Sequence, residues 1–61
     1  MKLTERELEN KKVFYSCEVT GNMFTTIHEA EEDAEANGDR YIIKFVKDRF
    51  GCWNDDKYIT I

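Results

Sequence analysis

The sequence predicts a small α+β domain of the ββαββ type, with one acidic helix packed on a curved antiparallel sheet. Stretches near the start and the end are rich in β-branched and aromatic residues, which favour strands. Between them lies one segment with the start and stop signals of a helix. With 61 residues the chain is long enough for one domain with a small core, so we expect residues 1–61 to form a single compact unit.

A short helical turn is expected before the first strand, over residues 5–10. Thr4 and Glu7 have the spacing of a capping box, in which each side chain accepts a hydrogen bond from the backbone N–H of the other residue. Leu3 and Leu8 occupy the hydrophobic-staple positions around this cap. Because so short a helix does not persist alone in water, we expect these leucines to pack on the domain or on a partner.

The first hairpin is expected over residues 12–26. Residues 12–20 alternate with period two, which is typical of a half-buried strand. Gly21-Asn22 predicts a two-residue turn, and that register pairs Phe24 with Val19. The residues expected to share the inner face are Val13, Tyr15, Cys17, Val19 and Phe24.

The helix is expected to begin after Thr26, which has capping-box spacing to Glu29, and to end at Asn37-Gly38. At about 100° per residue, one narrow apolar stripe lies on one side of this helix and would rest on the sheet. Its members are Ile27, Ala30 and Ala34. This stripe buries little area, so we expect the helix to be held weakly.

The last part of the chain predicts a second hairpin. Residues 41–46 are apolar on both sides, which suits a central strand, and residues 48–51 form its loop. Residues 52–54 continue as strand, and a second turn then leads to a final strand over residues 58–61. The alternative is one long bulged strand over residues 51–61.

Negative charge is concentrated in the helical segment, although the formal net charge of the chain is only −4. Six acids lie between residues 29 and 39 without any Lys or Arg: Glu29, Glu31, Glu32, Asp33, Glu35 and Asp39. Those outside the apolar stripe, namely Glu29, Glu32, Asp33 and Glu35, are expected to face solvent. The six acids span about 16 Å along the axis, an average of about 3 Å per charge, which is close to the roughly 3.4 Å per phosphate of one DNA strand. The segment is therefore either a solvated face or a binding surface for a basic partner.

A second candidate surface is aromatic. Phe14, Phe50, Trp53 and Tyr58 would lie on the sheet face away from the helix or on the loop edge. Large aromatic side chains are favoured as interface anchors, so Phe50 and Trp53 join the acids as predicted partner-binding residues. An exposed apolar face on so small a domain also favours a homodimer.

The residue inventory argues against catalysis and against a metal site. The chain has one His, one Ser and two Cys at distant positions, and it has no glycine-rich phosphate loop, GxSxG or HExxH motif. Cys17, His28 and Cys52 lack the spacing of a zinc site. We therefore predict no enzyme activity, no catalytic residue, no metal and no cofactor. The two cysteines are expected to be reduced thiols, with a Cys17–Cys52 bridge as the alternative.

Sequence features also bear on location and on nucleic acid. No apolar run approaches the roughly 20 residues that span a bilayer, and the first residues lack the apolar core of an export signal. We expect a cytoplasmic protein without a membrane partner, complete from its initiator Met1. Lys44, Lys47 and Arg49 alternate with aromatic residues as in some single-strand binders, but the acidic helix repels phosphates, so direct nucleic-acid binding is not favoured.

A resemblance adds to this interpretation. Lys11-Lys12 leads into an aromatic-rich first strand, and a hairpin and the acidic stretch from Glu29 to Glu35 follow. Over about residues 10–47 this arrangement resembles small early proteins of lytic phages that inhibit host enzymes, among them inhibitors of bacterial RNA polymerase. The resemblance implies a compact acidic α+β domain that binds a basic groove of a host enzyme and has no chemistry of its own. The stretch from Phe50 to Ile61 departs from that pattern.

Three functions follow as hypotheses. The first is a phage-type inhibitor in an infected bacterium that occludes a basic groove of a nucleic-acid-handling or defence protein, with nucleic-acid mimicry as one way to do so. RNA polymerase, a nuclease and a repair enzyme are examples of such a partner. The second is a homodimeric structural or regulatory domain, and the third is a weak single-stranded nucleic-acid binder.

Overall fold

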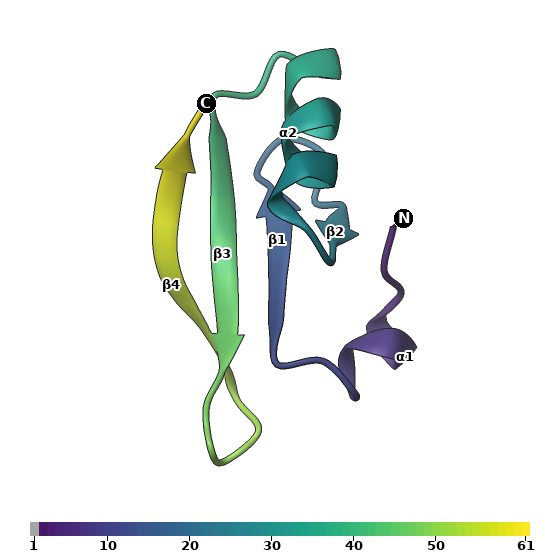
Figure 1. Cartoon of the computed structure of the whole chain (residues 1–61), viewed down its shortest axis with the longest axis vertical. Coiled ribbons are helices and arrows are strands. Elements are labelled where there is room, and N and C mark those ends of the chain that lie inside the picture. Colours follow the sequence, from purple (N-terminus) through teal and green to yellow (C-terminus); the bar gives the residue numbers. More distant parts are fainter. Residues whose placement is uncertain (1) are drawn as a thin grey trace.

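A four-stranded antiparallel sheet in the order β2-β1-β3-β4 carries one helix on one of its faces (Figure 1). The computed structural model describes residues 2–61, so Met1, the expected initiator, lies outside the described residues. The elements in chain order are α1 Glu5–Leu8, β1 Val13–Cys17, β2 Met23–Phe24, α2 Ile27–Ala36, β3 Tyr41–Lys47 and β4 Trp53–Thr60. The predicted ββαββ class, with a short helix before it, is confirmed.

The core lies between α2 and the sheet. Ala30 and Ala34 of the helix are fully buried, and so are Cys17 of β1 and Ile42 of β3. Phe24 completes this cluster, with the side chains of Tyr15, Ile27 and Ile59 packed around it. The predicted alanine stripe is confirmed, and its small side chains allow the helix to approach the sheet closely.

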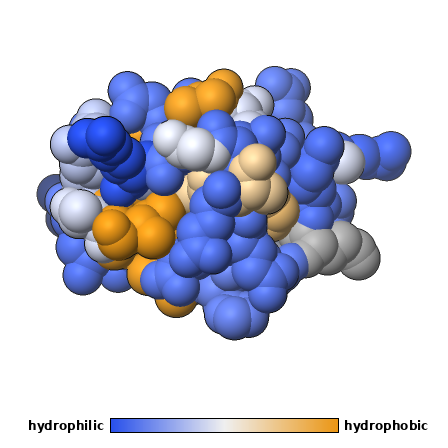
Figure 2. Space-filling model, turned by 90° about the horizontal axis from the view of Figure 1, so that it is seen from above, coloured by the Kyte–Doolittle hydropathy of each residue, from blue (hydrophilic) through white to orange (hydrophobic). Residues whose placement is uncertain are grey.

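The β1–β2 connection differs from the predicted two-residue turn. β1 ends at Cys17, and Tyr15 rather than Val19 lies opposite Phe24. The N–H of Gly21 donates to the carbonyl of Cys17 over 2.8 Å, so the chain turns back early through a wider loop. Val19 is consequently 65% exposed, and this end of the molecule shows scattered hydrophobic groups on a mostly hydrophilic surface (Figure 2). The partner of Phe24 is thus four residues earlier in β1 than predicted. Because side chains alternate between the two faces of a strand, this even shift leaves Phe24 on the predicted inner face.

The last strand is continuous, as the bulged alternative predicted, and the expected turn over residues 54–57 is absent. Lys44 pairs with Lys57 and Phe45 pairs with Asp55, which leaves Asp56 as the extra residue of a β-bulge. The edge strand therefore carries both a bulge and charged side chains in its middle. Both features disfavour pairing of this edge with another strand.

The N-terminal segment is tied to the sheet by hydrogen bonds. The predicted capping box of Thr4 and Glu7 is present, although α1 ends at Leu8 rather than near residue 10. Leu3 is buried, and its N–H donates to the carbonyl of Met23 over 2.7 Å. The Lys47 ammonium donates to the carbonyls of Leu8 and Glu9 over 3.1 Å each, which places a cation at the helix C-terminus. α1 lies beside the start of β1 (Figure 1).

The sheet face opposite α2, which we call the open face, is rich in apolar residues. Strand register and ring contacts place six of them there: Phe14, Tyr41, Ile43, Phe45, Trp53 and Tyr58. Phe14 stacks on Phe45 and meets Trp53 edge to face, with ring centroids 4.8 Å apart in both pairs. Tyr41 and Tyr58 remain 43% and 58% exposed. Alternation within residues 41–47 would have identified Tyr41 as a member of this face from the sequence.

Both cysteines are free thiols, so the alternative of a Cys17–Cys52 bridge is wrong. Cys17 is buried under α2, where its thiol donates to the carbonyl of Ala30 over 3.0 Å, whereas Cys52 is exposed beside the β3–β4 loop. Across residues 2–61, none of the helices has the length and hydrophobicity needed to cross a membrane.

Candidate partner-binding surface

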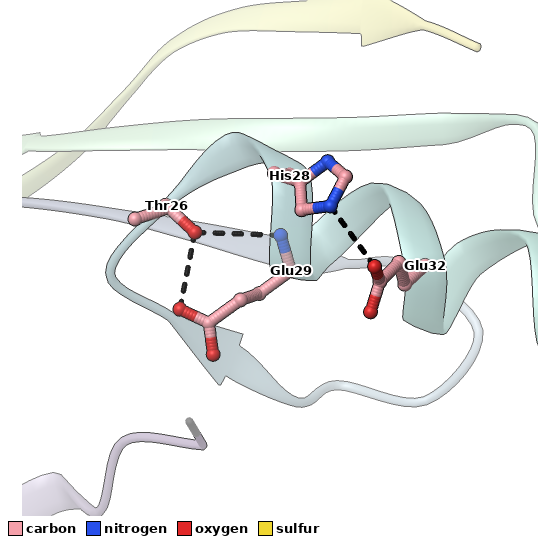
Figure 3. Close-up of polar contacts among 4 residues, drawn as sticks. All are labelled: Thr26, His28, Glu29 and Glu32. Atoms are coloured by element: carbon pink, nitrogen blue, oxygen red, sulfur yellow. Dashed lines mark hydrogen bonds and ion pairs between the residues drawn. The ribbon is translucent and has the colours of Figure 1, made fainter.

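The start of α2 is fixed by its cap. The Thr26 hydroxyl accepts a hydrogen bond from the N–H of Glu29 over 3.3 Å, as the sequence predicts (Figure 3). The same hydroxyl lies 3.1 Å from the Glu29 carboxylate, to which it donates. This carboxylate sits at the positive end of the helix dipole, which stabilises its charge.

The end of α2 is also fixed. The side-chain amide of Asn37 donates to the carbonyl of Asp33 over 2.8 Å, and the Asn37 N–H donates to the same carbonyl over 3.2 Å. Gly38 follows with a φ of 72°, in the left-handed region that favours glycine. The predicted stop is therefore confirmed, and both ends hold the ten residues of the helix in place.

Glu32 lies on the side of α2 away from Ala30 and Ala34. Its carboxylate lies 3.0 Å from Nε2 of His28 one turn earlier, and the side chains of Glu32 and His28 are 69% and 78% exposed (Figure 3). Glu35 is exposed, and Glu31 is half-buried on the flank. No Lys or Arg within the described part of the chain forms an ion pair with Glu31, Glu32 or Glu35.

Asp33 does not face solvent as predicted but holds the β1–β2 loop. The Thr20 hydroxyl donates to its carboxylate over 2.7 Å, and the side-chain amide of Asn22 lies 3.4 Å from both carboxylate oxygens. The hydrogen bond from Thr20 is the main reason that the pKa of Asp33 lies below its usual value. Asp33 therefore connects the helix to the loop that covers its flank.

Asp39 has a similar structural role. Its carboxylate accepts hydrogen bonds from the backbone N–H groups of Val19, Arg40 and Tyr41, over 3.0, 2.8 and 3.3 Å. The bond from Val19 contributes most to lowering the pKa of Asp39. Asp39 thus joins the β1–β2 loop to the start of β3. Its carboxylate is occupied by hydrogen bonds within the fold.

α2 carries four glutamates, which we call the acidic face: Glu29, whose carboxylate also accepts from the Thr26 hydroxyl, and Glu31, Glu32 and Glu35. They come from one ten-residue helix that is capped at both ends and contains no Lys or Arg. Asp33 and Asp39 lie beside this face but serve the fold. That any of the six acids contacts a partner remains a prediction.

The two predicted aromatic contacts lie elsewhere on the molecule. Phe50 sits at the tip of the β3–β4 hairpin, 78% exposed, with the Arg49 guanidinium 5.0 Å from its ring centroid. This tip lies at the far end of the long axis from α2 (Figure 1). Trp53 belongs to the open face, on the opposite side of the sheet. The structure therefore separates the predicted site into three places.

The basic residues do not combine with the aromatic ones into a single surface. Lys44 of β3 and Lys57 of β4 are opposite each other in the strand register, on the helix side of the sheet. The Lys44 ammonium lies 3.9 Å from the Asp56 carboxylate. Lys47 is on the open face, but its ammonium is bound to the α1 carbonyls and lies 5.0 Å from the Trp53 ring centroid. This arrangement differs from the continuous basic groove of single-strand binders.

Within residues 2–61 the structure contains neither an enclosed pocket nor a group of three or more side chains that could hold a metal ion. Burial, together with the nearby Asp33, raises the pKa of the Cys17 thiol from 9.0 to about 11. At neutral pH this thiol is protonated and is a poor nucleophile. Comparison of the chain with protein-family models, curated proteins and solved structures gives no match.

Proposed function

We propose that this protein is a non-enzymatic inhibitor of the phage type, acting in the cytoplasm of an infected bacterium. It binds a basic groove of a nucleic-acid-handling or defence protein through the acidic face and blocks that groove. The observation that carries the proposal is the outer side of α2, where four glutamates occur within ten residues without a Lys or Arg among them. A helix with this charge attracts Lys and Arg side chains of a partner over distances beyond direct contact.

The spacing of the acids favours mimicry of a nucleic-acid backbone. Glu29 and Glu35 are six residues apart, which corresponds to about 9 Å along the helix axis. The four carboxylates are therefore about 3 Å apart on average along the axis, against roughly 3.4 Å between phosphates of one DNA strand. A groove that binds phosphates would meet a similar number of negative charges per unit length along this helix.

Rigidity of the helix supports the same function. Caps at Thr26 and Asn37 fix both ends, and the alanine stripe holds the helix close against the sheet. A partner therefore does not have to order this backbone on binding, and the entropic cost of association is lower.

The test is capture from a bacterial lysate at low salt with the immobilised protein. A variant with Glu31→Gln, Glu32→Gln and Glu35→Gln raises the formal net charge from −4 to −1, since it removes three negative charges. Its matched control carries Glu5→Gln, Glu9→Gln and Glu18→Gln, which give the same net charge from exposed positions outside α2. We expect the wild type and the control to retain a basic nucleic-acid-handling or defence protein that the helix variant loses.

Competition then tests mimicry. Double-stranded DNA added to the captured complex should displace the target, and the complex should weaken steeply as the salt concentration rises. Equal capture by the helix variant and its control would reject the acidic face as the contact. A complex that resists both DNA and salt would reject mimicry.

A further inference from the structure

The open face is an apolar surface that the proposed function leaves unused. An antiparallel sheet with one covered face normally presents polar residues on the other. Here the strand positions on the uncovered side are mostly aromatic or branched, and no helix of residues 2–61 packs over their centre (Figure 1). Tyr41 and Tyr58 are exposed there, and Ile43, Phe45 and Trp53 are only half-buried.

We propose that the open face is a dimer interface, on which a second copy of this chain packs sheet against sheet. The dimer has four layers, with the two sheets in the middle and one α2 on each outer side. The proposal does not depend on the function of the acidic face.

Charge favours a second copy as the occupant. Among the strand positions of the open face, Lys47 and Asp55 are the charged residues, one of each sign, so two copies meet without a cluster of like charges. The acids of α2 lie on the other side of the sheet. Packed sheets are about 10 Å apart and each helix lies about 10 Å beyond its sheet, so the two acidic faces are about 30 Å apart. This distance exceeds the Debye length of about 8 Å at physiological salt, and the repulsion between them is largely screened.

The available area indicates a weak dimer. β3 and β4 have seven and eight residues. β1 and β2 add five and two residues. At about 3.3 Å per residue and about 4.8 Å per strand, the four strands together cover about 350 Å² on each copy before side-chain relief is counted. The total of about 700 to 1,000 Å² lies below the roughly 1,200 Å² at which specific, stable interfaces begin, in the range of weak and transient ones. We therefore expect association that depends on concentration.

The edge of β4 is a poorer alternative for self-association. Its middle carries the bulge at Asp56 together with Asp55 and Lys57, and these features disfavour strand-to-strand pairing. Association through the open face leaves this edge in solvent.

The test is sedimentation equilibrium of the purified protein from about 1 µM to about 1 mM. We expect the wild-type mass to rise from one copy to two over this range. Tyr58→Glu places a charge on the open face and should weaken the dimer at least about tenfold. Phe50→Glu makes the same chemical change at the exposed hairpin tip, outside the face, and should dimerise as the wild type does.

A second measurement needs no variant. Trp53 is the only tryptophan in the chain and lies on the open face, so its fluorescence emission should shift to the blue as the concentration rises. Raising the salt from about 50 mM to about 500 mM should leave this shift intact or enlarge it, since screening removes repulsion between the two copies. A wild type that stays monomeric at every concentration would assign the face to another partner and overturn the proposal. Equal effects of Tyr58→Glu and Phe50→Glu would overturn it as well.

Discussion

At the scale of single residues, the glutamates of α2 and three of the aspartates have different roles. Glu32 and Glu35 extend into solvent from α2, whereas Asp33, Asp39 and Asp48 each bind the chain at a turn. An aspartate is short enough to reach backbone N–H groups close to it in sequence, as Asp39 and Asp48 do, whereas Asp33 binds side chains of the β1–β2 loop. Negative charge in this protein is therefore partly structural and partly available to a partner.

Asp48 organises the β3–β4 hairpin. Its carboxylate accepts hydrogen bonds from the N–H groups of Phe50 and Cys52, over 2.8 and 2.9 Å, and from the side-chain amide of Asn54 over 3.2 Å. We expect Asp48→Ala to lower the thermal midpoint, and Asp48→Asn to lower it less because an amide oxygen still accepts from the backbone. Thermal unfolding followed by circular dichroism checks this order, with Asp55→Asn as an exposed control. Equal midpoints for all variants would contradict it.

The two cysteines should differ strongly in reactivity. Cys52 is exposed, whereas Cys17 is fully buried and its raised pKa of about 11 keeps the thiol protonated. At about pH 8, a thiol reagent should therefore modify one cysteine per molecule in the native protein and two in denaturant. Mass spectrometry after proteolysis should place the first modification on Cys52. Rapid native modification of Cys17 would show that α2 leaves the sheet readily.

At the scale of elements, α2 depends on its ends because its buried stripe is thin. Thr26→Ala removes the acceptor for the N–H of Glu29 and should destabilise the protein by about 1 kcal/mol. Thr26→Ser keeps the hydroxyl and should be nearly neutral, so it serves as the matched control. Urea unfolding measures both changes. A loss below about 0.3 kcal/mol for the alanine variant would mean that packing alone holds the helix.

Local signals predicted the elements well and their pairings less well. The capping residue Thr4, the helix stop at Asn37 and the alanine stripe depend on neighbouring residues only, and the structure confirms them. The β1–β2 register depends on contacts from distant parts of the chain, because Asp33 and Asp39 hold the loop that leaves Val19 exposed. No spacing within residues 12–26 carries that information.

The candidate site shows the same division between local and distant information. The acids of α2 lie together because a single helix carries them, and this was predictable from their positions in the sequence. Phe50 and Trp53 were grouped with them by residue type. The topology instead places Phe50 at the far hairpin tip and Trp53 on the open face. Which side of the sheet a strand residue occupies relative to α2 depends on long-range pairing.

At the scale of the whole molecule, the sheet separates two surfaces of opposite character. The acidic face lies on one side and the open face on the other (Figure 1). Because they share no residues, a charge change at Glu32 and an apolar change at Tyr58 should act independently. A protein of this size therefore has room for one electrostatic contact and one apolar contact at the same time.

The pH dependence of stability should show two limits set by different parts of the fold. The pKa values of Asp33, Asp39 and Asp48 are lowered by hydrogen bonds, so the folded state binds fewer protons than the unfolded chain in acid. These three carboxylates contribute fully to the free energy of unfolding above about pH 5, and this contribution is lost as the pH falls through their pKa values in the folded state. Cys17 acts in the opposite direction, since its raised pKa of about 11 favours the folded state below about pH 9 and this advantage is lost as the pH rises toward 11.

We therefore expect thermal midpoints that are level from about pH 5 to about pH 8 and fall on both sides. Asp39→Asn should flatten the acid limb because an amide does not titrate, and it should leave the alkaline limb unchanged. Cys17→Ala should lower all midpoints through the lost packing of a buried side chain, but flatten the alkaline limb. A midpoint that rises continuously down to about pH 3 would contradict the stabilising role of the hydrogen bonds that Asp33, Asp39 and Asp48 accept.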